Sequence, residues 1–287
     1  MRLIRFSTGD APAVPGVLVD NRAVALADLV PDVPADMAAV IADWDRLGPL
    51  LATASMAGGE SLDMVRLRAP IARPGKILAI GLNYADHIEE SKEAGLKIPT
   101  EQVWFCKHAT SVNDPYGDVE LPKVSAMLDY EVELVAVIGR KGRHIRREDA
   151  PAHVFGYCVG NDVTVRDWQH RTPQWMLGKS FDTHCPFGPA IVTADEVRDP
   201  HELGIHCLVN GELRQNSNTR HLVFDLWEQI AHLSQAMTLE PGDLVFTGTP
   251  GGIGFGSKPY RPLKAGDVVR CEVDGLGFIE NRVVPEA

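Results

Sequence analysis

Hydrophobic and polar residues alternate over many short segments of this chain, and alternation with a period of two is typical of β-strands. Most of these segments are bounded by Gly, Pro or Asn-Gly, which favour turns. The pattern predicts strands at 76–85, 132–139, 154–164, 188–194, 204–213, 242–249 and 266–277. Clear helical periodicity is confined to 85–95 and 223–237 in this part of the chain. Many short strands with few helices predict a β-rich α+β fold.

The first 70 residues have a different character. Residues 14–30 indicate a hairpin with an Asp-Asn turn, and the Ala- and Leu-rich segment 34–54 is helical in period, in one piece or two. This part contains neither His nor Cys, and we find no clustered chemistry in it. A segment rich in Pro and Arg follows at residues 67–77. We therefore predict a small N-terminal α+β domain, residues 1–70, and a second domain, residues 71–287.

Composition narrows the class of protein. The 287 residues are 45% hydrophobic and 23% charged, and the formal net charge of −11 argues against a nucleic acid or an anionic membrane as partner. No apolar run reaches membrane length, and the first residues lack the apolar core of a signal peptide. The five cysteines are widely spread without a CxxC motif, so we expect reduced thiols and a cytoplasmic location.

Three acids recur at every second position in "LDYEVELVAVIG", residues 128–139. On one continuous strand Asp129, Glu131 and Glu133 would share a face, where like charges repel and need a positive partner. A solvated face is the alternative, but "VAVIGR" continues as a core strand, so we expect Glu131 and Glu133 to point inward. Asp162 ends another apolar strand about 30 residues on and is a candidate third ligand for a hard cation such as Mg²⁺.

A second polar cluster lies in "GLNYADHIEES". His87 and Glu90 are i, i+3 neighbours on the predicted helix, so the carboxylate could orient the imidazole as a general base that activates water. An exposed helix without chemistry is the alternative. The polar content of the segment also suits a lid that closes over a site.

Two further segments could contact an anion. Lys179 lies in the mostly apolar "MLGKSFDTHCPFGP" and is either partly buried against an anion or on the surface; His184 and Cys185 beside it suit packing better than thiol chemistry. The glycine-rich "FTGTPGGIGFG" fits neither the Walker pattern nor GxGxxG. Its Thr247 and Thr249 hydroxyls, with backbone N–H groups, could hold a carboxylate.

Five motifs occur in a fixed order from about residue 75 to the C-terminus: "GLNYADH", "DYEVELVAVIG", "GYCVGNDVTVRDWQ", "GKSFDT..PFGP" and "PGDLVFTGTPGGIG". In these motifs and their order the chain resembles the fumarylacetoacetate hydrolase family. The first 70 residues resemble the smaller N-terminal domain that many members carry. The resemblance implies a mixed β-sandwich roll for the second domain, and a homodimer.

The resemblance also implies roles for single residues. The ligands that it implies for Mg²⁺ or Mn²⁺ are Glu131, Glu133 and Asp162. The catalytic residues that it implies are the water-activating pair His87 and Glu90, on a lid, and Lys179, which would meet the substrate's oxygens. The substrate-binding residues that it implies are Arg166, Gln169 and Thr249.

Some positions do not follow the family pattern. Asp129 has no place among the metal ligands, so we expect it behind them or in solvent. Relatives often have proline after the lysine of "VWFCKHATSV", so Cys106 and His108 could alter the pocket wall.

Members of the family that the chain resembles act on 2-oxo acids with a second carbonyl or carboxylate nearby, so the resemblance implies such a substrate here. A metal chelated by the C1 carboxylate and the C2 oxygen stabilises the enolate that forms when a carbon–carbon bond breaks. We predict a metal-dependent hydrolase that cleaves the C3–C4 bond of a 2,4-dioxo acid, an acylpyruvate or a diketo-deoxy sugar acid, to pyruvate and a carboxylic acid. The alternatives are an oxaloacetate decarboxylase, an isomerase or tautomerase of an unsaturated 2-oxo diacid from aromatic catabolism, and a non-catalytic scaffold with a vestigial metal site.

Overall fold

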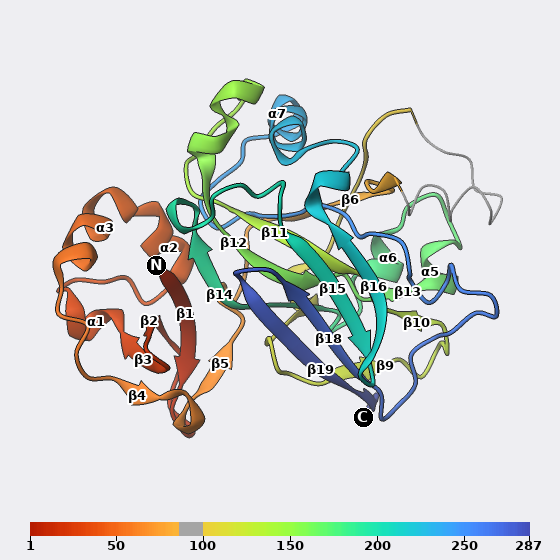
Figure 1. The fold of residues 1–287 in the computed structure, drawn as a ribbon, viewed down its shortest axis with the longest axis horizontal. Coiled ribbons are helices and arrows are strands. Elements are labelled where there is room, and N and C mark those ends of the chain that lie inside the picture. The colour runs from red at the N-terminus through yellow and green to blue at the C-terminus, as the bar shows by residue number, and fades with distance from the viewer. Residues whose placement is uncertain (86–99) are drawn as a thin grey trace.

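The computed structural model describes residues 1–85 and 100–287, and a large sheet runs across the molecule (Figure 1). Twelve strands of the described chain form this sheet. Ten of them follow one another in the order β4 (Glu60–Ser61), β3 (Arg22–Ala25), β2 (Val14–Val19), β1 (Arg2–Ser7), β14 (Cys185–Thr193), β12 (Val154–Asn161), β11 (Val132–Ile138), β17 (Leu244–Phe246), β6 (Ile77–Gly81) and β7 (Val103–Cys106). The other two are β5 (Arg66–Arg68), which pairs with β1, and β8 (Val112–Asn113), which pairs with β14.

A smaller sheet packs against the middle of the large one. Its five strands in the described chain have the order β16 (Glu212–Asn218), β15 (Gly204–Val209), β18 (Val268–Val273), β19 (Gly277–Pro285) and β9 (Val119–Leu121). A separate two-stranded ladder consists of β10 (Leu128–Asp129) and β13 (Thr164–Val165).

Strand β11 lies at the centre of the fold, with every residue buried. Leu134 packs in a core cluster with Val269 of the smaller sheet. Val135, the next residue, packs in another cluster with helices α2 (Met37–Ala42) and α3 (Trp44–Thr53). Because successive residues of a strand point to opposite faces, β11 is covered by the smaller sheet on one face and by the N-terminal helices on the other.

The N-terminal segment joins the large sheet through β1, which pairs antiparallel with β14. The predicted hairpin is β2 and β3, with Asp20 and Asn21 at positive φ, as a tight hairpin turn requires. The predicted helical segment 34–54 contains α2 and α3, so both predictions are confirmed. The predicted domain boundary after residue 70 stays a prediction.

Helix α7 (Leu226–Ala236) confirms the helix predicted at 223–237. A capping box begins it: the Asp225 carboxylate accepts from the backbone N–H of Glu228 at 2.9 Å, and the Glu228 carboxylate accepts from that of Asp225 at 3.0 Å. The other described helices are α1 (Leu26–Leu29), α5 (Arg166–Gln169) and α6 (Met176–Lys179), with 3₁₀ turns η1 (Leu62–Met64), η2 (Ala109–Ser111), η3 (Arg147–His153), η4 (Ala194–Glu196) and η5 (Thr219–His221).

We expect the Asp225→Ala variant to lower the free energy of unfolding by about 1 kcal/mol, because an orphan N–H of the first turn of α7 loses its acceptor. Urea denaturation followed by circular dichroism measures the change. Asp10→Ala, at an exposed turn, serves as control and should leave stability unchanged. An unchanged midpoint for Asp225→Ala would show that the cap does not hold the helix end.

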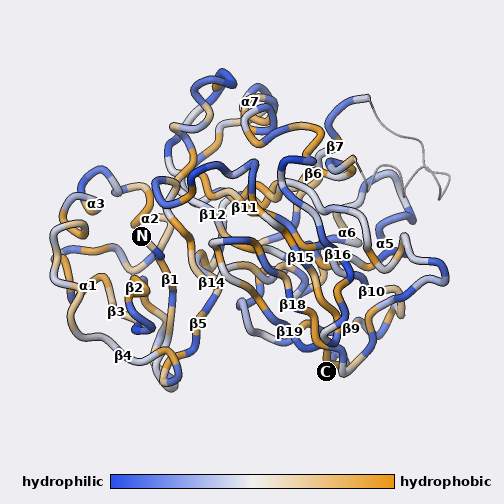
Figure 2. The backbone as a smooth tube through the Cα atoms, in the orientation of Figure 1, coloured by the Kyte–Doolittle hydropathy of each residue, from blue (hydrophilic) through white to orange (hydrophobic). Residues whose placement is uncertain are grey.

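The predicted β-rich α+β fold is confirmed, and each of the seven predicted strand segments overlaps a strand. Figure 2 shows hydrophobic residues along strands in the middle of the molecule and hydrophilic ones on outer loops. Residues 86–95 of the other predicted helix lie outside the described residues. No helix within the described ranges is long and apolar enough to cross a membrane.

Candidate metal centre

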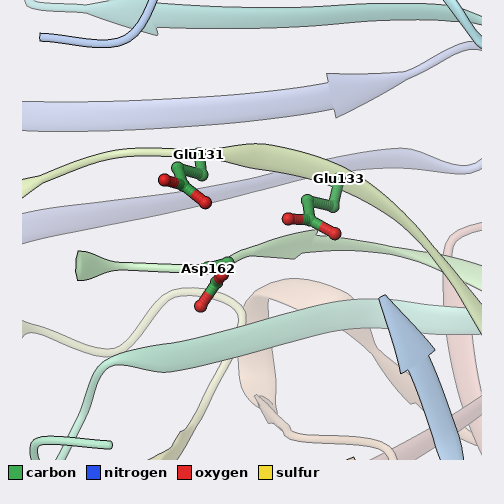
Figure 3. Close-up of side chains that lie close together, drawn as sticks. All are labelled: Glu131, Glu133 and Asp162. Carbon is green, nitrogen blue, oxygen red and sulfur yellow. The ribbon is translucent and has the colours of Figure 1, made fainter. Parts of the chain in front are cut away.

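Three buried carboxylates converge where β11 and β12 meet (Figure 3). Glu131 directly precedes β11, Glu133 lies on it, and Asp162 directly follows β12. The pairing of Val132 with Asn161 brings the two strand ends together, and the Asp162 N–H donates to the Glu131 carbonyl at 2.9 Å. Each side chain offers one oxygen, and these oxygens lie within 4.8 Å of one another. The three predicted metal ligands are therefore brought together.

The structure corrects the expectation of one strand with three acids on one face. The chain leaves the ladder at residues 130–131, because β10 pairs with β13 whereas β11 pairs with β12 and β17. Asp129 consequently points elsewhere: its carboxylate accepts from the Arg166 Nε at 2.8 Å and from the backbone N–H groups of Gly254 and Phe255 at 2.8 and 2.9 Å. Asp129 is fully buried, so it is not in solvent. Of the two positions expected for it, the one behind the metal ligands remains.

Lysine and arginine side chains balance much of the negative charge. Lys179 Nζ lies 2.8 Å from Glu131 Oε2 and 2.5 Å from Asp162 Oδ2. Arg166 Nη1 lies 2.6 Å from Glu131 Oε1. Lys107, which the sequence reading did not single out, has its Nζ 2.6 Å from Asp162 Oδ1. The sequence signal for Lys107 was its position at the end of the apolar strand β7. A lysine that is buried at such a position needs an acidic partner.

The donor set fits a hard divalent cation. In this part of the described chain three cationic side chains face four carboxylates, counting Asp129, so negative charge is in excess. Burial and the neighbouring carboxylates Asp162 and Glu131 raise the pKa of Glu133 well above its usual range. Burial opposes the charge of Lys179, but Asp162 and Glu131 outweigh it and raise the pKa of this lysine. A divalent cation would relieve the repulsion at Glu133, and carboxylate oxygens are the ligands that Mg²⁺ and Mn²⁺ prefer.

A cavity opens beside Glu131, one of the three carboxylates. The polar side chains in its lining are Glu131, Arg166, Gln169, His170, Lys179 and Thr249. The rest of the lining is Ile80, Gly81, Leu82, Trp175, Ile253 and Phe255. The predicted substrate-binding residues and Lys179 thus share one pocket, and their roles stay predictions. At Gly81 a Cβ would come within 2.3 Å of the Trp175 ring, so glycine lets this indole pack against the strand end.

Hydrogen bonds inside the protein hold two of the pocket's polar side chains. Gln169 Oε1 accepts from Arg166 Nη1 at 3.0 Å, and Thr249 Oγ1 accepts from Gln215 Nε2 at 2.8 Å. Gln215 also accepts from the backbone N–H of Val132 at 3.0 Å. The sequence reading missed Gln215, which lies in the smaller sheet and contacts the site only through folding.

The glycine-rich loop after β17 holds carboxylates of the protein itself. The Gly248 N–H donates to Glu133 Oε2 at 2.7 Å, with a φ of 102° that favours glycine. As described above, the next part of the loop donates to Asp129. The Thr247 hydroxyl donates to the Leu134 carbonyl at 2.9 Å, so the expectation that Thr247 holds a substrate carboxylate is wrong.

Four other candidate residues of the described chain are not part of the lining of the cavity. His184 and Cys185 are fully buried, and burial raises the pKa of the Cys185 thiol, which agrees with a packing role. Cys106 and His108 are exposed, and neither is in the described lining of the cavity. His87 and Glu90 lie outside the described residues. All five cysteines are free thiols, as predicted.

Residues 76–284 match the family model for the fumarylacetoacetate (FAA) hydrolase C-terminal region. Over 222 residues, 77% of this chain and 70% of the relative, the chain is 50% identical to the mitochondrial oxaloacetate tautomerase FAHD2A of Homo sapiens. A fumarylacetoacetate hydrolase from Exiguobacterium antarcticum superposes over 100% of both chains with a TM-score of 0.86 and 37% identity. The maleylpyruvate hydrolase from Sphingobium sp. SYK-6, in complex with a manganese(II) ion and pyruvate, does so with a TM-score of 0.81 and 33% identity.

Proposed function

Since the chain belongs to the fumarylacetoacetate hydrolase family, we propose that it is a metal-dependent enzyme that interconverts the enol and keto forms of oxaloacetate. The observation that carries this choice is the 50% identity with an oxaloacetate tautomerase over 77% of the chain. The buried carboxylates beside a lysine-lined cavity support it, because they suit a 2-oxo acid bound next to a divalent cation.

The reaction needs two proton transfers and stabilisation of negative charge. In going from enol to ketone, the C2 hydroxyl passes its proton to a base or to solvent and C3 takes a proton from an acid or from solvent, through an enolate with negative charge on the C2 oxygen. A divalent cation held by Glu131, Glu133 and Asp162 would supply positive charge to that oxygen. Lys179 Nζ, held by Glu131 and Asp162 at 2.8 and 2.5 Å, would donate a hydrogen bond to it.

The remaining lining of the cavity suits a small dicarboxylate. Arg166, Gln169 and Thr249 would bind and orient its carboxylates through charge and hydrogen bonds. Ile80, Ile253 and the aromatic rings of the lining would exclude water around a bound substrate, which would strengthen these interactions. Tautomerisation needs no attacking water, and the described residues would supply binding and charge stabilisation.

Hydrolysis of the C3–C4 bond of a 2,4-dioxo acid, the reaction predicted from the sequence, is the second candidate. The likeness to the Sphingobium maleylpyruvate hydrolase over the whole chain favours it. This reaction needs an activated water, and the residues predicted for that task, His87 and Glu90, lie outside the described part. Oxaloacetate decarboxylation is a further outcome that the assay must separate.

With Mn²⁺ or Mg²⁺, the purified protein is expected to accelerate ketonisation of enol-oxaloacetate by at least about 10²-fold over buffer. Ultraviolet absorbance of the enol measures the rate, and NMR follows all products. Protein treated with EDTA is the control and should be inactive until the metal is restored. Pyruvate with an equal amount of carboxylic acid from an acylpyruvate would favour the hydrolase instead, and pyruvate with CO₂ from oxaloacetate would favour the decarboxylase.

Assembly and location follow from other arguments. We propose a small-molecule 2-oxo acid as the partner of this site and a homodimer as the assembly, both from the family resemblance. The human relative is a mitochondrial protein, so the cytoplasmic location expected from the cysteines stays a prediction.

A further inference from the structure

The two cationic side chains in the lining of the cavity face carboxylates of the protein itself. Arg166 lies 2.8 Å from Asp129 through both Nε and Nη2, and its Nη1 lies 2.6 Å from Glu131. Lys179 Nζ contacts Glu131 and Asp162 at 2.8 and 2.5 Å. Much of this positive charge is therefore neutralised within the protein, and a substrate with two carboxylates would gain from a further donor.

His170 is a polar side chain of the lining whose imidazole has no hydrogen-bond partner among the described residues. Gln169 and Thr249, by contrast, are held by the hydrogen bonds given above. His170 is also exposed, so it lies where the cavity opens to solvent, directly after helix α5. A neutral imidazole has one N–H donor and one acceptor nitrogen, and both are available here to a ligand.

The backbone and the ring of His170 are held in place. Its backbone N–H donates to the Arg166 carbonyl at 3.1 Å and closes the last turn of α5. Its ring lies 5.4 Å from the ring of Phe255, at an interplanar angle of 33°. Phe255 also lines the cavity, and its backbone N–H donates to Asp129 at 2.9 Å. Two segments of the chain therefore set the position of the imidazole.

The charge state of His170 suits a hydrogen-bond donor. Partial burial, and then the charges of Arg166 and Lys179, lower the pKa of His170 from its usual value, against the opposite effect of Glu131. The imidazole is therefore neutral at neutral pH and keeps one N–H. Replacing it with an uncharged side chain leaves the net charge of the site unchanged, so a substitution here removes a hydrogen bond and not a charge.

We propose that His170 donates a hydrogen bond to the distal carboxylate of a bound 2-oxo diacid and thereby favours dicarboxylates over 2-oxo acids with a single carboxylate. The inference rests on the proposed function, in which the C1 carboxylate and the C2 oxygen of oxaloacetate lie toward Glu131 and Lys179. The C4 carboxylate would then extend toward the mouth of the cavity, where His170 lies. A ligand without this carboxylate cannot make the charge-assisted hydrogen bond.

Two unreactive analogues measure the contribution of the distal carboxylate, because L-malate and L-lactate differ only by the carboxylate on C3. Isothermal titration calorimetry on the intact protein with saturating Mg²⁺ gives their dissociation constants. The ratio Kd(lactate)/Kd(malate) is expected to fall about tenfold in His170→Leu. A change in metal binding or in folding affects both ligands alike and cancels in the ratio. His170→Gln keeps an N–H donor and should retain most of the wild-type ratio.

His232→Leu, at an exposed position of helix α7, is the matched control and should keep the wild-type ratio. An unchanged ratio in His170→Leu overturns the inference and leaves the proposed reaction standing. A wild-type protein that does not ketonise oxaloacetate, but whose ratio falls in His170→Leu, overturns the proposed reaction and supports the dicarboxylate site. Wild-type protein that binds malate no more tightly than lactate, or binds neither, overturns the inference.

NMR on the wild-type protein decides the matter if His170→Leu does not fold. The imidazole resonances of His170 in the presence of Mg²⁺ are expected to shift when malate is added and to stay in place with lactate. Equal shifts with the two ligands, or no shift with malate, overturn the inference.

Discussion

The Glu133→Gln variant is expected to lose about 10³-fold or more in kcat, because the amide replaces one of three charged ligands at the centre of the site. Binding of Mn²⁺ measured by calorimetry should weaken in parallel. Stability should not fall with activity: burial, Asp162 and Glu131 raise the pKa of Glu133, so its charge opposes folding of the metal-free protein. The Tm of the metal-free variant is therefore expected to equal or exceed that of the wild type.

Glu272→Gln is the matched control for Glu133→Gln, since Glu272 lies on strand β18 and pairs with Arg270 at the surface. It should keep both activity and metal affinity. Wild-type kcat in Glu133→Gln at saturating Mn²⁺ would contradict a metal centre built on this residue. A large drop in Tm would instead assign Glu133 a structural role.

The Arg166→Met variant is expected to lose about 3–5 kcal/mol of unfolding free energy, because a buried charge network loses its central cation. Asp129 loses its ion-pair partner at 2.8 Å, and Glu131 loses the contact at 2.6 Å while keeping Lys179. Burial already raises the pKa of Asp129 although Arg166 and the Phe255 N–H oppose the rise. Denaturant unfolding of the metal-free protein measures the loss.

A second substitution separates charge from packing in this network. Asp129→Asn added to Arg166→Met removes the charge left without its partner, so the double variant should recover part of the lost stability. Arg146→Met, which breaks an exposed pair with Asp149, should leave stability unchanged. A loss below about 1 kcal/mol in Arg166→Met would mean that water or another side chain compensates Asp129.

Local patterns were enough for the central strands of the large sheet and for the longest described helix, but not for strands such as β1, β7 and β9. The apolar run in 132–139 and the helical period in 223–237 depend on neighbouring residues only, and β11 and α7 follow them. Strand β19 was missed although its burial alternates, because the polar Asn281 occupies one of its buried positions. The helix predicted from residue 85 to 95 stays a prediction.

In the candidate site, too, local patterns predicted some residues, and only the tertiary structure showed the others. Glu131 and Glu133 were found because an i, i+2 pair on a strand must share a face, and Asp162 because it ends an apolar strand. Lys107 is 55 residues away from Asp162 in the sequence, and Gly248 is 115 away from Glu133. No local period connects residues so far apart, so these partners became visible only when the order of strands in the sheet was known.

The amino-acid sequence by itself determined the family, the strand-rich class and the three carboxylates, since each depends on residue types at short, regular spacing. The tertiary structure alone decided that Asp129 leaves this group, because the ladder changes partners between β10 and β11. It also decided which cation meets which oxygen: Arg166 at Glu131, and Lys107 and Lys179 on opposite oxygens of Asp162. Charge pairing in a buried site depends on distance in space, and only the packing of the two sheets sets that distance.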